Sequence, residues 1–557
     1  MKKVKKSIAL LIVLVMGLGL LAACGSGDTG PAADGGTGTG AGTGGGETPV
    51  PTVPEVGDAP VDGANLADHI DLIVDTALQI VNPFTLAGTG APVAWASFMI
   101  LDRLLEQPEP GVFAAQLAVR WYTEDYQHFR FYLRDDVYFH NGDHFTAEDV
   151  VWNVEFAHAN PGSPAFGRWR FVDTITAVDT YVIEIVLTEP HVDFFFDIAN
   201  YYTSIHSPRA FYESQDDPTW GHIGTGPFRV VGFSSNDFLS LERFDEYWGG
   251  PAPTRSITMW TIPEMATRTV MLQNGEAQVS FSMTPEDLDF FEDSPDFQTF
   301  VVRLNPPIIL GFNNQGDEIM MCRYFRRAVA HALNTEDISL AAMGRWAQPP
   351  WDGNFWGPET QFRLENMPQR AFDLELARYY LDRSVYNGET IEIMTAVHYN
   401  IRASEFIQLL LGDVGINVNV ETTDISGFIE AHRFDPEDDS RQMHIFAVGM
   451  LPVALQAMRT TFYPGIGTNR LNINNDYLTG LIDELAATIE PDARRDIAHQ
   501  IQEFFWEDIP AIPLWWRLQG IPAVNGIGGM RLSADQFNYC LRGIFWDLDQ
   551  APAHLMP

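Results

Sequence analysis

The sequence predicts a mixed α/β fold, because segments with strand character alternate with segments of helical periodicity along a globular chain. Phe129 to Leu133 (FRFYL) alternates at the strand period, and Tyr181 to Leu187 (YVIEIVL) is rich in β-branched residues. Cys322 to Leu333 (CRYFRRAVAHAL) places its apolar residues at helical spacing. The composition stays globular from about Asn65 onward, so we expect both kinds of element throughout this part of the chain.

Other elements follow in chain order. Ile70 to Ile80 (IDLIVDTALQI) predicts a strand that runs into a turn. A helix is expected to begin at Thr146, because threonine is a favoured N-cap and the acidic residues after it suit the positive end of the helix dipole. Ile482 to Phe505 has helical spacing that is broken at Pro491, and further prolines end this helix before a strand-like Leu514-Trp515-Trp516.

Composition excludes several classes of protein. The 557 residues correspond to three or four domains at about 150 residues each. With 46% hydrophobic and 19% charged residues, the chain is neither disordered throughout, nor collagen, nor coiled coil. The net charge of −40 repels phosphate backbones, so we expect no nucleic-acid partner. Three cysteines exclude a disulfide scaffold but leave open a pairing of Cys322 with Cys540.

The N-terminus predicts export and a lipid anchor. A lysine-rich start is followed by an apolar run from Ile8 to Leu21 and then by Ala22-Ala23-Cys24. This arrangement resembles the bacterial lipobox, in which the cysteine becomes the lipidated first residue of the mature chain. We expect residues 1–23 to be a signal peptide, and Cys24 to hold the protein on the extracytoplasmic face of the cell membrane. An uncleaved anchor helix is the alternative.

A flexible tether is predicted over residues 24–64. Glycine, mixed with Ser, Thr, Ala and Asp, dominates the first part of this segment, and Pro49, Pro51, Pro54 and Pro60 follow. Such a composition buries too little apolar surface to fold, and it gives a coil that stiffens toward its proline-rich end.

Motifs spread from about Asn82 to Trp516 resemble one family, in the order in which they occur there. These segments resemble the signature of extracellular solute-binding protein family 5, the substrate-binding lipoproteins of peptide/nickel-type ABC transporters, similar to oligopeptide- and dipeptide-binding proteins. Within the Gly224 to Phe228 turn, we expect the glycines to supply backbone angles closed to other residues. The motifs are Leu117 to Trp121 (LAVRW), Val137 to Asp143 (VYFHNGD), Phe145 to Val151 (FTAEDVV), Gly224 to Phe228 (GTGPF), Asp245 to Trp248 (DEYW), Arg326 to Asn334 (RRAVAHALN) and Arg494 to Leu514.

The resemblance implies an α/β, periplasmic-binding-protein-like two-lobe fold (type II, cluster C) with three domains and a ligand cleft between the lobes. Domain I is expected in three parts, at residues 65–105, 205–312 and 525–557. Domain II is expected as an insertion at 106–204, and domain III, the second lobe, at 313–524. Closure of the lobes around a solute is how such proteins work.

The resemblance also bears on the ligand. In peptide-binding members, an aspartate in the second lobe pairs with the ammonium group of the peptide, as a buried cation requires. The matching segment here is His444 to Pro452 (HIFAVGMLP), in which Gly449 is present, Met450 replaces the family's tryptophan, and no aspartate follows before Thr460. A peptide ligand therefore needs another acid, or else the ligand lacks a free ammonium group.

Two further segments carry ligand-binding candidates. The loop from Arg345 to Pro358 is placed near the cleft mouth by the resemblance, and its aromatic side chains either contact the ligand or pack the loop onto the lobe. The loop after Ile391 to Val397 offers polar groups, including an arginine for a carboxylate, although a solvated surface charge is the common case. Trp95 is expected in the core. The candidates are Trp346, Trp351, Trp356, Tyr399, Asn400 and Arg402, together with Gly449 and Met450.

No catalytic or metal site is predicted. His140 and His144 are four residues apart, but Asn-Gly-Asp between them is turn chemistry, and His140 matches a motif that family members share whatever their ligand. The motifs of a nucleophile elbow, a zinc helix and a P-loop are absent from the sequence, which argues against an exported hydrolase.

We therefore predict a monomeric, lipid-anchored binding protein of an ABC importer that captures peptides and uses no cofactor. Its expected partners are the solute, the permease and ATPase subunits, and the membrane through its lipid. Alternative solutes are a nickel complex, an oligosaccharide or another small polar molecule. A sensor or chaperone on the same fold is the alternative function.

Replacing Cys24 with Ser should release the protein from the membrane fraction, because the thiol that carries the lipid is lost. Fractionation followed by immunoblotting measures this, and the circular dichroism spectrum should remain unchanged. A variant that stays in the membrane fraction would show that lipidation is not the anchor.

Overall fold

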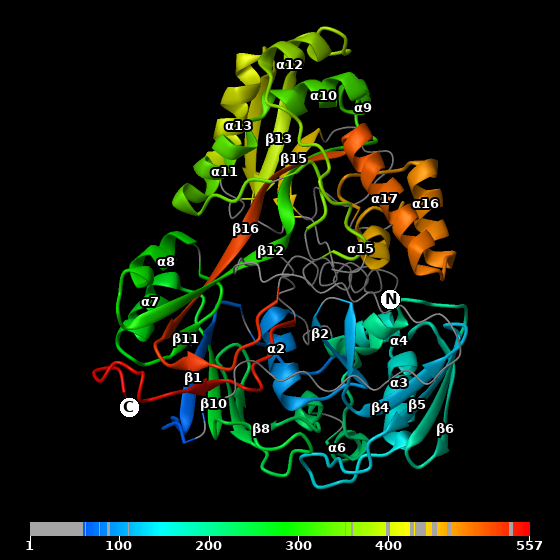
Figure 1. Ribbon diagram of the computed structural model, residues 1–557, viewed down its shortest axis with the longest axis vertical. Coiled ribbons are helices and arrows are strands. Elements are labelled where there is room, and N and C mark those ends of the chain that lie inside the picture. Colours follow the sequence, from blue (N-terminus) through cyan, green and yellow to red (C-terminus); the bar gives the residue numbers. More distant parts are fainter. Residues whose placement is uncertain are drawn as a thin grey trace, which may run out of the picture. The chain divides into compact units, whose positions relative to one another are not determined.

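The chain forms two compact units, each with its own core. The computed structural model describes residues 60, 61, 63–76, 78–85, 90–109, 111–214, 217–283, 285–350, 352–357, 360–396, 401–423, 428, 442–447, 454–464, 469–533 and 538–556 (Figure 1). The insert unit is Arg303–Leu518. The terminal unit combines the described residues up to Val302 with Gln519–Pro557. The predicted signal peptide, Cys24 and the tether up to residue 59 lie outside the described residues.

The terminal unit contains a sheet in which distant segments pair. Its strands run in the order β11-β1-β10-β9-β8, and β1 lies parallel to β10 with His69 opposite Ser256. The strands β8, β9 and β10 are consecutive in sequence and pair antiparallel. The parallel pairs join β1 to strands that are distant from it in sequence. The bounds are β1 His69–Val74, β8 Phe228–Ser234, β9 Phe238–Arg243, β10 Ser256–Thr261 and β11 Val279–Ser280.

A second sheet of the terminal unit is antiparallel, in the order β4-β5-β7-β6. In β5, Phe129, Phe131 and Leu133 alternate inward into a separate core. The helix expected to begin at Thr146 is present as α3. Its first turn is closed by a capping box, in which Asp149 Oδ2 accepts the Thr146 N–H at 2.7 Å. The bounds are β4 Ala118–Thr123, β5 His128–Leu133, β6 Val172–Asp179, β7 Val182–Leu187, α3 Ala147–Ala159 and α4 Pro164–Trp169.

Three of the sequence motifs meet at the end of α2 (Ala91–Ile100), around Asp102, whose side chain is fully buried. Asp102 accepts hydrogen bonds from Thr225 Oγ1 at 3.0 Å and Trp248 Nε1 at 2.9 Å. His140 joins the cluster through Gly226, whose carbonyl oxygen lies 2.9 Å from His140 Nε2. These motif residues therefore build the terminal unit.

The reason for the glycines in the Gly224 to Phe228 turn differs from our expectation. Neither Gly224 nor Gly226 has a positive φ. A Cβ on Gly226 would instead lie 2.6 Å from the Met99 carbonyl oxygen, and one on Gly224 would lie 2.5 Å from that of Ile100. Close packing against the last turn of α2, and not a left-handed backbone, excludes a side chain at both positions.

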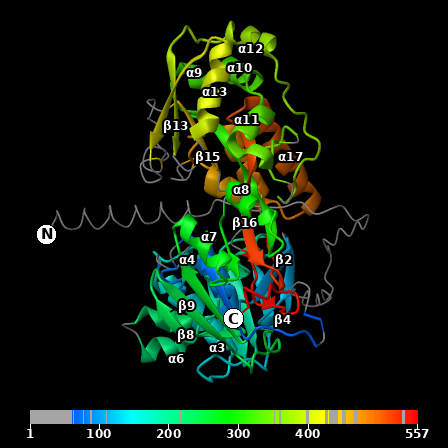
Figure 2. The ribbon, with the colours of Figure 1, turned by 90° about the vertical axis from the view of Figure 1, so that its left-hand side faces the viewer.

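The insert unit is a mostly parallel sheet between two groups of helices. Its strands run in the order β14-β13-β15-β12, where β13 is parallel to both neighbours and β12 antiparallel to β15. Helices α10 to α13 form one group and α15 to α17 the other (Figures 1 and 2). The bounds are β12 Phe297–Phe312, β13 Thr390–Ala396, β14 Asn417–Thr423, β15 Met443–Ala447, α10 Arg323–Ala332, α11 Thr335–Met343, α12 Leu374–Leu381, α13 Ile401–Asp413, α15 Ala454–Thr461, α16 Asp476–Ala487 and α17 Pro491–Asp508.

The break predicted at Pro491 is present, since Pro491 begins α17. The strand after α17 starts earlier than expected and includes Pro513, so this proline does not stop the strand. The remaining elements are β2 Leu105–Glu109, β3 Val112–Ala115, α5 Phe194–Ile198, α6 Pro208–Glu213, α7 Met265–Gln273, α8 Pro285–Glu292, α9 Glu318–Met321, β16 Ala511–Val524, β17 Ile527–Gly528 and β18 Phe545–Trp546.

The two later cysteines are not paired: Cys322 and Cys540 are both free thiols, in different units. Trp95 is 1% exposed, so the expectation that it lies in the core is confirmed. Among the described helices, not one has the length and apolar character needed to cross a membrane.

The terminal unit should lose stability as the pH falls from about 6.5 to about 4, because three of its histidines are buried in the neutral form. Burial lowers the pKa of His140 and of His222 to about 4, and that of His206 to about 3. His140 Nδ1 accepts the Gly224 N–H, at 3.3 Å, so protonation there breaks a hydrogen bond.

Above the pKa of histidine in the unfolded chain, these histidines are neutral in both states and the protein has its full stability. As the pH falls below that value, each histidine lowers the free energy of unfolding by about 1.4 kcal/mol per pH unit until its pKa in the folded state is reached. Urea unfolding at pH 7.5 and pH 5 measures the difference, which should be smaller in His140→Gln. An unfolding free energy that is the same at both pH values would contradict this assignment.

Candidate ligand-binding site

Three strands of the insert unit end together at one edge of its sheet. Ala396, the last residue of β13, lies opposite Thr423 of β14, and Thr395 lies opposite Ile445 of β15. The strand β15 ends two residues later at Ala447. We call this line of strand ends the carboxyl edge. In α/β sheets, ligands bind at the carboxyl ends of parallel strands, because the loops that leave them converge there.

The chain enters the insert unit next to the same edge. Ala447 lies opposite Ile308 of β12, five positions after the unit begins at Arg303. The edge therefore adjoins the point at which the chain crosses between units.

Four of the predicted ligand residues follow directly after these strand ends. Tyr399 and Asn400 come after Ala396, and Gly449 and Met450 come after Ala447. All four lie outside the described residues. The structure thus describes where their segments start and leaves their role in ligand binding a prediction.

Arg402 lies at the start of α13, which follows β13 from the carboxyl edge. It is in the first turn of this helix and is exposed, while Ala403 and Ile407 are buried against the sheet. The apolar face of α13 therefore fixes the helix and leaves the guanidinium outside. A guanidinium beside a helix N-terminus favours an anionic group, because both are positive.

The predicted tryptophans divide between surface and core. Trp346 ends a short 3₁₀ turn, Gly344–Trp346, is half-buried, and has the Arg345 guanidinium 5.0 Å from its ring centre. Trp351 lies outside the described residues. Trp356 is 0% exposed and belongs to the core of the insert unit, where its backbone N–H donates to Asn354 Oδ1 at 2.9 Å. The Trp356 side chain therefore packs in this core, and ligand contact by the tryptophans of this loop stays a prediction.

The loop after Trp346 is fixed next to β16. The backbone N–H of Trp516 donates to the Gln348 carbonyl at 2.8 Å. The backbone N–H of Gln348 donates to Ser339 Oγ, also at 2.8 Å. Trp516 is two positions before β16 leaves the unit at Leu518. This places the start of the loop, with Trp346, near the same end of the unit as the carboxyl edge.

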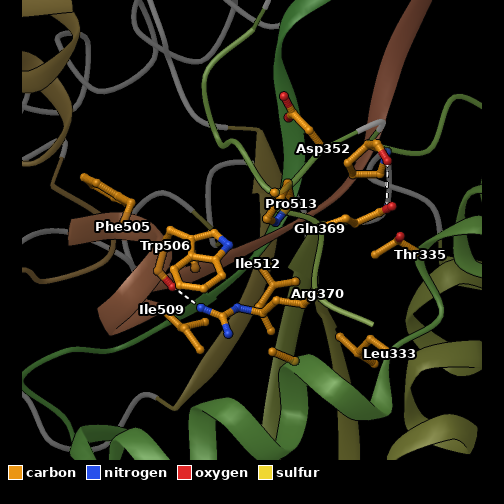
Figure 3. Close-up of a pocket in the computed structure, with 14 residues that line it drawn as sticks. Leu333, Thr335, Asp352, Gln369, Arg370, Phe505, Trp506, Ile509, Ile512 and Pro513 are labelled. Carbon is orange, nitrogen blue, oxygen red and sulfur yellow. Dashed lines mark hydrogen bonds between the residues drawn. The ribbon is translucent and has the colours of Figure 1, made fainter. Parts of the chain in front are cut away.

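None of the predicted ligand residues lines a cavity of about 50 Å³ in the insert unit (Figure 3). On one wall, the guanidinium of Arg370 lies 4.4 Å from the Trp506 ring centre and donates to the Trp506 carbonyl. Asp352, also in the wall, pairs with the buried Arg363. Sequence analysis did not single out Arg370 or Trp506, because neither lies in a motif with a known ligand.

This cavity lies at the opposite edge of the sheet. Ile512 and Pro513 of its lining begin β16, and the nearby Pro510 carbonyl accepts the Phe312 N–H at 3.1 Å. Phe312 lies opposite Met443, the first residue of β15. Since loops from parallel strands converge only at the carboxyl edge, we place the candidate ligand site there and not in this cavity.

Comparison with known proteins agrees with this architecture. The chain resembles the solved ABC transporter substrate-binding protein CtaP from Listeria monocytogenes (TM-score 0.76, 19% identity, covering 86% of this chain and 100% of that one). It also resembles DppA from Helicobacter pylori, solved in complex with the peptide STSA (TM-score 0.68, 20% identity, 86% and 98% covered). The fold is that of the two-lobe periplasmic binding proteins.

The family follows from the sequence match. The family described as bacterial extracellular solute-binding proteins, family 5 Middle, matches residues 112–467, which is more than half of the chain. The protein therefore belongs to the bacterial extracellular solute-binding proteins of family 5, which are extracytoplasmic. One relative, the glutathione-binding protein GsiB of Pectobacterium atrosepticum, is 26% identical over 303 residues, which is 52% of this chain and 57% of the relative's length. The homologous proteins found by these comparisons are solute-binding proteins and not enzymes.

Truncating Trp346 and Trp356, the two candidate tryptophans that the structure describes, should destabilise the protein to different extents. Trp356→Ala should lower the free energy of unfolding by about 3–5 kcal/mol, because it leaves a cavity in the core. Trp346→Ala should cost less than about 1 kcal/mol, since the side chain is only half-buried. Urea unfolding measures both. Equal losses for the two variants would make Trp346 a packing residue and remove it from the ligand candidates.

Proposed function

We propose that this protein is a lipid-anchored binding protein of an ABC importer, which captures peptides by closure of two lobes and delivers them to a membrane permease. The observation that carries the proposal is the carboxyl edge of the insert unit. Three parallel strands end there in register, and the segments that follow contain the ligand candidates Tyr399, Asn400, Gly449 and Met450.

The charge at this edge supports a solute with a carboxylate. Arg402 is exposed in the first turn of α13, in a chain whose net charge is −40. A carboxylate needs a local positive exception to that field, and Arg402 with the helix N-terminus provides one. The C-terminal carboxylate of a peptide fits this group.

The named ligands of similar proteins support the same class of solute. DppA was solved with a peptide, and GsiB is named for glutathione binding. Family membership supports delivery to a permease, and the Ala22-Ala23-Cys24 segment supports the lipid anchor.

A solute without an ammonium group is the second candidate. It is favoured by the sequence after Gly449, which lacks the aspartate that pairs with a peptide ammonium in peptide-binding members. A nickel complex, an oligosaccharide or another small polar solute belongs to this class.

Native mass spectrometry of the full chain carrying Cys24→Ser, purified without denaturation, separates the two. A series of adducts with the masses of mixed short peptides is the expected result. One discrete adduct of another chemical class would replace the peptide proposal with a dedicated small-molecule receptor. A bare protein that also fails to bind added peptide mixtures would contradict peptide capture.

Arg402→Gln provides the matched control for the carboxylate. The unmodified protein should bind peptides with a free carboxylate about 10-fold or more tightly than the same peptides amidated, as a charge-assisted hydrogen bond implies. The variant should lose this preference while keeping its affinity for the amides. A preference that survives the substitution would place the carboxylate elsewhere.

A further inference from the structure

A small polar cavity lies within the terminal unit. Its inner wall is formed by Arg103, Glu106 and Cys540, which are 3%, 4% and 3% exposed. Gln107 and Arg531 are half-buried and form its rim. The cavity has about 10 Å³ open to the centre of a water-sized sphere, which is enough for one such particle.

The groups in this wall have hydrogen-bonding atoms without partners. Among the described residues, Arg103 Nε and Nη1, Gln107 Nε2 and Arg531 Nη1 are buried donors that contact no acceptor within hydrogen-bond distance. The Arg103 guanidinium is held in place because its carbon lies 4.3 Å from the centre of the Phe98 ring. Arg531 Nη1 has the Glu106 carboxylate 3.7 Å away as an ion-pair partner, so the donors that lack any partner among the described residues are those of Arg103 and Gln107. Leaving a donor without a hydrogen bond in a protein interior is costly, so these donors point to a missing acceptor.

Charge around the cavity is also unbalanced. Arg542 pairs with Asp102 at 2.7 Å, and Glu106 forms longer ion pairs with Arg531 at 3.7 Å and with Arg542 at 3.8 Å, beyond hydrogen-bond length. The described side chains of this cluster thus include three guanidinium groups and two carboxylates. Burial, followed by the nearby positive charge of Arg542, lowers the pKa of Arg103 to about 10, as expected where positive charges crowd together.

We propose that this cavity is a binding site for one small monovalent anion of about the size of chloride. Arg103 and Arg531 supply the charge, and Gln107 supplies a further N–H from the rim. Among the described side chains, the excess of one positive charge fits a monovalent anion, and the space for a single water-sized particle sets its size. The site lies within one unit and is independent of the proposed solute.

A water molecule is the competing occupant. Glu106 Oε1 is also a buried atom without a hydrogen-bond partner, and water satisfies donors and acceptors alike, whereas an anion is repelled by this carboxylate. The two occupants therefore respond in opposite ways to removal of the Glu106 charge.

The experiment uses the purified full-length protein at constant ionic strength, with sodium gluconate replaced stepwise by sodium chloride. Gluconate is too large for the cavity. If chloride binds the folded state, the unfolding midpoint should rise by about 2 °C or more and then level off. Crystals grown with bromide should show an anomalous scattering peak beside Arg103 and Arg531.

Three variants sharpen the test. Arg103→Gln should abolish the chloride response. Glu106→Gln should move it to about 10-fold lower chloride, because a repelling charge is removed. Arg326→Gln is the control, since Arg326 is equally buried but its guanidinium donates to the carbonyls of Met320 and Asp508; it should lower the midpoint without changing the chloride response.

Two results would overturn the proposal. One is a bromide crystal with no anomalous peak in the cavity. The other is a midpoint that does not depend on chloride in both the unmodified protein and Glu106→Gln, which identifies the occupant as water. If Arg103→Gln does not fold, the chloride dependence of the midpoint in Glu106→Gln and the bromide crystal still test the proposal.

Discussion

The buried ion pair between Asp102 and Arg542 is the interaction on which the terminal unit depends. Their closest atoms are 2.7 Å apart, and both side chains are almost fully buried. The insert unit, Arg303–Leu518, separates the two residues in sequence, so the pair joins the N-terminal and C-terminal parts of one core across that insertion. Arg542 also donates to the carbonyls of Phe98 and Leu101, which satisfies acceptors at the end of α2. Removing one member of such a pair typically costs about 3–5 kcal/mol, because the other charge is left buried and unpaired.

The motifs that carry the family resemblance gain a physical meaning from this pair. Thr225 and Trp248 both donate to Asp102, and Gly226 packs too closely on α2 to bear a side chain. In this chain, these residues assemble the cluster around Asp102 from segments that are distant in sequence. The predicted ligand residues lie elsewhere in the sequence, after the aligned strand ends of the insert unit.

Sequence reasoning succeeded where the signal is local. The strands at β5 and β7, the capped start of α3 and the break before α17 depend on periodicity, capping and proline chemistry within a few residues, and all are present. It failed where the cause is long-range. Nothing near Asp102 or Arg103 in sequence reveals Arg542, and the glycines of the Gly224 to Phe228 turn were given a backbone reason when the real one is contact with α2. Trp346 and Trp356 look alike in a loop of prolines and glycines, and only tertiary packing distinguishes them.

The insertion also determines how the cores of the two units are built. The chain passes between the units within two continuous strands, β12 and β16, and each strand contributes to both cores: Val302 packs in the terminal unit and Ile308 in the insert unit, as do Ile521 and Leu514 respectively. Each unit therefore has its own core, to which both crossing strands contribute. The Asp102 cluster belongs to the terminal unit and the aligned strand ends to the insert unit, so we expect substitutions of the predicted ligand residues to leave the Asp102 cluster intact.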